Sequence, residues 1–152
     1  MKELNQYLTI LETRISFYEK ENLSISKSNV GWHIDHSLKV LIGIINILKN
    51  SNPEEYKWKF NKSRLFVYTL GFIPRGKGKA PKSVQSFEAI DLNDLNSQLE
   101  TTKKIISELN SLDKNANFNH PYFGVLNLKQ SIYFLKLHTK HHLKIIDDIL
   151  KK

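Results

Sequence analysis

The residues of this chain best suited to chemistry are its histidines, three of which fall within five positions near the C-terminus. They are His33, His36, His120, His138, His141 and His142. His138 and His142 are four residues apart, so on a helix both imidazoles project from one face about one turn apart. Two nitrogens placed in this way can bind one metal ion, as in the H-x-x-x-H pattern of zinc sites. This pair therefore indicates a metal centre.

His36 is the best candidate for a third ligand. It belongs to a second helical pattern, in a row with Val40 and Ile47, and it can face the pair across a helical core. Three neutral imidazoles suit Zn, Ni, Cu or Fe better than Mg or Ca. Three protein ligands also leave at least one coordination position for water or a substrate. We therefore expect a divalent transition metal bound by His36, His138 and His142.

The spacing alone leaves alternatives open, because histidines four residues apart also occur by chance and the pattern lacks the Glu of H-E-x-x-H. His33 and His141 are expected to flank the site at the surface or behind the ligands, although either could replace a ligand. His120 could carry protons to the open side of the metal, but a structural role in a turn is the simpler interpretation. Asp35 or Asp147 could hydrogen-bond to a ligand from behind.

Four long segments carry the 3.6-residue hydrophobic period that must position these histidines. They span residues 2–20, 30–50, 92–112 and 128–150. Candidate N-caps precede three of them, namely Ser28 or Asn29, Asp91 and Asn127. We therefore predict one all-α domain over residues 1–152, a four-helix bundle with a long crossover between the second and third long helices.

The crossover of about forty residues is too long for a simple loop in a compact domain. We expect a short helix near residues 65–72, followed by a basic Gly/Pro loop at 74–81. This loop, with Arg75 at its start, serves as a connection by default and recruits an anionic substrate as the alternative. The segment 120–124 is expected to form a turn whose aromatic residues pack against the end of the bundle.

Composition excludes several classes of function. The chain has no cysteine, which rules out disulfides, thiolate catalysis and Cys-type zinc sites. No apolar run reaches the ~18 residues of a membrane span. The N-terminus does not read as a signal peptide, so we expect a cytoplasmic protein. The net charge is +8, but the lysines are spread over every segment and no nucleic-acid motif accompanies them, so nucleic-acid binding is not expected.

Four motifs in order resemble the DinB/YfiT-like superfamily, whose members are regarded as metalloenzymes. Residues 31–40 resemble its second helix, and residues 74–82, 120–124 and 138–143 resemble one bacterial branch of it. That branch typically has a His-Pro-Phe-Phe-Gly turn, where this chain has Tyr122, and a His-x-x-His-His-Leu helix. The resemblance implies a four-helix bundle that often dimerises and places the three metal-binding histidines at His36, His138 and His142. Relatives include thiol transferases that use bacillithiol or mycothiol.

Together these features predict a metal-dependent enzyme that acts on a small molecule. The metal would activate a water or a low-molecular-weight thiol, for hydrolysis or thiol S-transfer. One alternative is a non-catalytic, metal-binding or stress-associated bundle protein, which would have a closed fourth coordination position. Another is a basic interaction module without metal, which would need a clustered Lys/Arg face.

Overall fold

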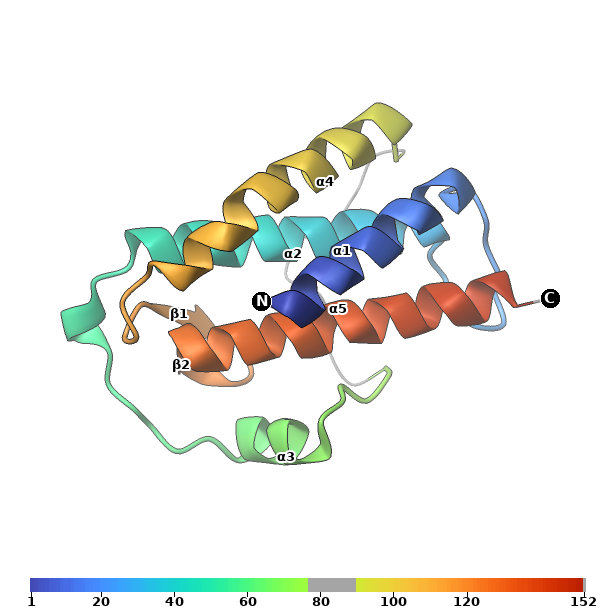
Figure 1. Cartoon of the computed structure of the whole chain (residues 1–152). Helices are drawn as coiled ribbons and strands as arrows, with labels where there is room; N and C mark the ends of the chain where they lie inside the picture. Colours follow the sequence, from blue (N-terminus) through green and yellow to red (C-terminus); the bar gives the residue numbers. More distant parts are fainter. Residues whose placement is uncertain (77–89, 152) are drawn as a thin grey trace.

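The structure is a computed structural model of the chain, and it describes residues 1–76 and 90–151. The described part is mostly helical and also contains a small antiparallel sheet (Figure 1). The helices are α1 (Lys2–Arg14), α2 (Val30–Asn50), α3 (Lys62–Leu70), α4 (Leu92–Ile105) and α5 (Leu128–Leu150), and the strands are β1 (Asn117–His120) and β2 (Gly124–Asn127). No helix in these two ranges is long and apolar enough to cross a bilayer.

The two longest helices, α2 and α5, lie side by side, and α1 and α4 pack against them (Figure 1). Contacts join α2 to α5 and α4, and α1 to α5 and α4. Leu38 and Ile45 of α2 and Leu135 and Ile146 of α5 have no exposed surface. Burying each such side chain contributes about 1.5–3 kcal/mol, so the core between these four helices fixes their arrangement.

The predicted N-caps start the helices where expected. Asn29 accepts a hydrogen bond from the Trp32 amide, and Asp91 accepts two from the first turn of α4. Asn127 forms a capping box with Gln130, in which each side chain bonds the other residue's backbone. Because the start of α2 is fixed in this way, the histidines of its first two turns are held in register against α5.

The first helix is shorter than the predicted 2–20, because backbone carbonyls in its predicted last turn accept hydrogen bonds from the start of α2 instead. The α-helical part ends at Arg14 and continues as the 3-10 turn η1 (Ile15–Phe17). The carbonyl oxygens of Tyr18 and Lys20 then accept hydrogen bonds from Gly31 and Val30 at 2.7 and 2.9 Å. These bonds satisfy amides at the start of α2, which are otherwise unpaired at a helix N-terminus.

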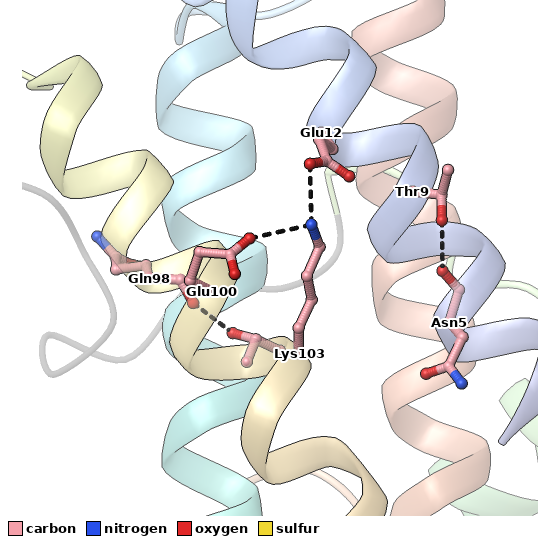
Figure 2. Close-up of polar contacts among 7 residues, drawn as sticks. Asn5, Thr9, Glu12, Gln98, Glu100 and Lys103 are labelled. Carbon is pink, nitrogen blue, oxygen red and sulfur yellow. Dashed lines mark hydrogen bonds and ion pairs between the residues drawn. The ribbon is translucent and has the colours of Figure 1, made fainter.

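The third long helix also ends earlier than the predicted 112. Beyond Ile105 it tightens into the 3-10 helix η4 (Ile106–Asn110), where β-branched Ile105 and Ile106 crowd the preceding turn. Lys103 joins this helix to α1 by bonding Glu12 at 2.8 Å and Glu100 at 3.0 Å (Figure 2). Surface ion pairs contribute only about 0–1 kcal/mol, so buried leucines of α4 contribute more to its position.

The prediction of an all-α fold is wrong at residues 117–127, which form a β-hairpin. His120 pairs with Gly124 across a three-residue connection. Gly124 has φ +68°, a conformation that glycine adopts without strain and that suits short hairpin loops. Phe123 of this connection is buried against the bundle, as expected for the turn, whereas Tyr122 is about half exposed.

The predicted short helix of the crossover is confirmed as α3 and begins three residues earlier than expected. Asn61 caps it and also donates to the Tyr122 carbonyl at 3.2 Å. The buried Arg64 donates to the Val125 carbonyl at 3.1 Å. These bonds attach α3 to the hairpin. Of the predicted basic loop at 74–81, residues 77–81 lie outside the described residues.

Candidate metal centre

The structure brings together the three histidines that the sequence predicts as ligands. One ligand atom from each of His36, His138 and His142 lies within 4.8 Å of the other two. His36 and His142 are buried, and His138 is partly buried. His33 pairs with His142 and His36 with His138, so residue numbers rise along α2 as they fall along α5. The two helices are therefore antiparallel, and one face of each supplies the cluster.

The spacing of the rings fits one small ion. His36 Nε2 lies 3.2 Å from His138 Nε2. Two nitrogens bound to a tetrahedral zinc at about 2.05 Å are about 3.3 Å apart, so this pair already has the required separation. The widest separation in the cluster, 4.8 Å, would have to shorten by about 1.5 Å.

His33, His138 and His142 have lowered pKa values, which favours their neutral form near pH 7. Burial, followed by the neighbouring histidines, lowers the pKa of His138 and His142 well below the ordinary value of 6.5. Burial likewise lowers the pKa of His33 to about 4. Only an unprotonated imidazole nitrogen can bind a metal, so little proton release is needed before an ion is bound.

A hydrogen-bonded chain stands behind one of the candidate ligands. His33 Nδ1 lies 3.0 Å from His142 Nδ1, and His33 Nε2 lies 2.9 Å from Ser26 Oγ. His33 is therefore a buried hydrogen-bond partner of His142 and does not lie at the surface. Metal-bound histidines almost always donate their second N–H to such a partner, which fixes the ring and its tautomer.

The direction of this chain decides which nitrogen of His142 is available. If His142 Nδ1–H donates to His33, and His33 Nε2–H donates to Ser26, then His142 Nε2 has a free lone pair. In the opposite direction the proton lies on His142 Nε2, and that nitrogen cannot bind an ion. A metal ion at His142 Nε2 would therefore select the first direction.

Trp32 covers the cluster, and the sequence interpretation did not include it. Its ring stacks on His36 with centroids 5.0 Å apart and an interplanar angle of 11°, and meets His33 edge-on at 5.1 Å. A further contact reaches His142 at 6.2 Å. The signal in the sequence was the position of Trp32 one turn before His36 on the same helix. Ser26 lies before the helix and carried no such signal.

The ring nitrogen of His138 that does not face His36 is buried without a partner in the described part of the chain. His138 Nδ1 has no hydrogen-bond partner among the described residues, although it is inaccessible to solvent. Leaving such an atom unpaired costs about 1–3 kcal/mol, so it calls for an explanation. A histidine whose only near nitrogen partner is His36 at 3.2 Å is poorly satisfied as a structural core residue.

The remaining predicted site residues lie around the cluster. The His141 ring meets that of His142 edge-on with centroids 5.2 Å apart and is hydrogen-bonded to the Ile73 backbone. Arg75 forms an ion pair with Asp148 at 2.7 Å. His120 Nδ1 accepts bonds from two amides of the hairpin turn, which supports the structural interpretation over a proton carrier. Asp147 pairs with Arg14, far along the chain.

Asp35, the other carboxylate considered as a partner of the ligands, is also engaged elsewhere. It is buried at the start of α2. Lys39 binds one of its oxygens at 2.8 Å, and Gln98 donates to the other at 2.7 Å. The Gln98 contact connects α2 to α4, so the carboxylate contributes to helix packing.

The comparisons with known proteins add no relative. No protein-family model, no curated protein and no solved structure matches this chain. The resemblance to the DinB/YfiT-like superfamily therefore stays a prediction from the motifs. What the geometry supports by itself is a helical protein with three histidines that could hold a metal ion.

Proposed function

We propose that this protein is a metal-dependent enzyme of the DinB-like type, with a divalent transition metal bound by His36, His138 and His142. The observation that carries the proposal is the convergence of these three imidazoles from two antiparallel helices. The proposed scaffold is a four-helix bundle of α1, α2, α4 and α5. Zinc, nickel and iron all suit three imidazoles, and cellular availability decides among them.

Bound there, such a metal would lower the pKa of a water or a low-molecular-weight thiol and so supply a nucleophile near neutral pH. The chain's own residues hold the ligand set in place. His33 and Ser26 orient His142, while Trp32 covers His36 and limits the access of water. The reactions that fit are hydrolysis and thiol S-transfer.

A non-catalytic metal protein is the second candidate, and the burial of His36 and His142 favours it. A structural site would close the fourth coordination position with another protein atom. His138 is less buried than the other two candidate ligands, which favours the open form on its side of the cluster. Cobalt substitution separates the two, since an added thiol changes the visible spectrum only where a position is open.

The first experiment is metal analysis of protein purified without a histidine tag. We expect about one equivalent of metal in the parent and none in His138→Ala or His142→Ala. His141→Gln is the matched control, because His141 lies on the same helix next to His142 but outside the triad. Equal metal content in all four proteins would contradict the proposal.

A further inference from the structure

A separate cavity lies beside the metal centre, between α5 and the segment that follows α3. Its volume is about 250 Å³. Leu137, Lys140, His141 and Lys144 of α5 form one wall. These positions are spaced as i, i+3, i+4 and i+7, so they share one face of the helix. The segment after α3 supplies the other walls.

The ionisable residues that line this cavity are all basic. Arg75, Lys140 and Lys144 carry positive charge, and His141 is the fourth titratable side chain. Arg75 is also paired with Asp148 at 2.7 Å, so its positive charge is partly neutralised and Lys140 and Lys144 supply most of the positive charge. A concave surface lined by charges of one sign concentrates ions of the opposite sign. The cavity is therefore suited to an anion.

Apolar side chains form the rest of the lining. Phe72 and Ile73 lie on one side and Leu137 on the other. Small-molecule sites typically combine such apolar walls with a few charged groups, in volumes of about 300–1,000 Å³. At about 250 Å³ the cavity is slightly smaller than that range, which suits a small organic anion and excludes a folded partner.

The cavity and the histidine cluster share a wall. His141 lines the cavity, and its ring lies perpendicular to that of His142 with centroids 5.2 Å apart. Leu137, which also lines the cavity, is the residue directly before the candidate ligand His138. One residue corresponds to about 100° on a helix, so the basic face of α5 adjoins the face that carries the candidate ligands.

We infer that this cavity binds the anionic group of a small organic ligand with an apolar body, and that the substrate of the metal centre belongs to this class. The second part rests on the proposed function, and the first does not. Arg75, Lys140 and Lys144 attract and hold the anion, while Phe72 and Leu137 contact the apolar body.

Amide chemical shifts of the isotope-labelled full chain test the binding. Phenyl phosphate is the probe and benzyl alcohol its neutral counterpart, each titrated into dialysed metal-free protein and into zinc-loaded protein. We expect phenyl phosphate to shift the amides of Phe72, Arg75, His141 and Lys144 at either metal state, and the effect to weaken with added salt. Benzyl alcohol should leave these amides largely unchanged.

Charge variants connect the binding to the cavity. In Lys140→Gln/Lys144→Gln, both changes lie at exposed helix positions, and we expect the dissociation constant for phenyl phosphate to rise about fivefold. Lys129→Gln is the matched control, an exposed lysine in the first turn of the same helix, and should bind as the parent does.

Three results would overturn the inference: shifts spread over the whole surface, equal shifts with benzyl alcohol, or equal weakening in the control. In the metal-free protein these results concern only the cavity, because no metal takes part in the binding. Phenyl phosphate binding at the cavity in a protein that fails to take up zinc would support the first part of the inference and remove the proposed function.

Discussion

Replacing His33 by phenylalanine tests how the candidate centre holds its ligands. Phenylalanine keeps an aromatic ring at the edge-to-face contact with Trp32, where the centroids are 5.1 Å apart. It removes both nitrogens, and with them the 3.0 Å contact to His142 Nδ1 and the 2.9 Å contact to Ser26 Oγ. The variant therefore deletes the hydrogen-bonded chain and leaves His36, His138 and His142 in place.

The expected loss of affinity follows from the tautomer of His142. A metal on Nε2 confines the proton to Nδ1, where His33→Phe leaves it buried without an acceptor. The metal-free protein avoids much of this cost, because its proton can move to Nε2. An unpaired buried donor costs about 1–3 kcal/mol. Losing such a partner typically weakens metal binding about 10–100-fold, which is about 1.4–2.7 kcal/mol. The cost of an unpaired buried donor and the expected loss of metal-binding free energy are therefore of the same size.

Trp32 provides the assay. The chain has two tryptophans, so in a Trp58→Phe background the emission comes from Trp32, which stacks on His36. Cobalt quenches a nearby indole, and zinc affinity follows from competition with cobalt. We expect the zinc dissociation constant of His33→Phe to exceed the parent's about 10–100-fold. Ser26→Ala keeps the His33–His142 contact and removes the outer contact to His33, together with a bond from the Ser28 amide, so it should weaken binding by a few-fold at most.

Two results would refute this reasoning in different ways. Unchanged affinity in His33→Phe would mean that the chain behind His142 does not orient it. Loss of binding as complete as in His138→Ala would make His33 a direct ligand. Thermal unfolding of each metal-free variant must stay near that of the parent, so that a change in affinity is not a change in folding.

Other predictions concern stability. Gly31→Ala places a Cβ 2.9 Å from the Tyr18 carbonyl oxygen and should lower the free energy of unfolding by about 1–3 kcal/mol. Gly43→Ala has open space around it and should raise that free energy by about 0.5–1 kcal/mol, as urea denaturation will show. Burial lowers the pKa of His120 to about 4 in the fold. Its contribution to stability is therefore full above the unfolded pKa of 6.5 and is lost as the pH falls towards 4, and His120→Gln should flatten the measured pH dependence. Zinc at a hundred times its dissociation constant should raise the unfolding free energy of the parent by about 2.7 kcal/mol, and should not stabilise His138→Leu.

Much of the helical framework was predictable, because it depends on local signals. The cap residues Asn29, Asp91 and Asn127 and the 3.6-residue period placed the starts of three long helices correctly. The end of α1 was not predictable, since it depends on hydrogen bonds from Gly31 and Val30 to carbonyls far back in the chain. Periodicity carries no information about such partners.

The hairpin escaped prediction for a related reason. Each strand has only four residues, too few for an alternating pattern to stand out from a turn. His120, Pro121 and Gly124 were recognised as turn residues, but the pairing of β1 with β2 requires the strands to meet over the end of the bundle. The buried Arg64 of α3 bonds the hairpin backbone, and only the folded chain brings it there.

For the site, the sequence identified the right helix faces but could not resolve neighbouring histidines. His33 and His36 are three residues apart on α2, and both turn towards α5. Which of them meets which histidine of α5 depends on how far the two helices are shifted along their axes relative to each other. This axial shift is set by buried leucines and isoleucines elsewhere in the core. The roles of His33 and Ser26 could therefore not be predicted from the spacing of residues in the sequence.

The energetics of the cluster favour a ligand over a purely structural role. Four imidazoles are gathered at one level of a core that is otherwise filled by leucine and isoleucine. Apolar side chains of similar size would pack there without polar atoms to satisfy, whereas His138 Nδ1 is buried without a partner. His36 Nε2 and His138 Nε2 face each other at 3.2 Å, an arrangement in which two neutral rings gain at most one modest hydrogen bond. A cation between them would be bound by both Nε2 lone pairs, which is a stronger interaction than that single hydrogen bond.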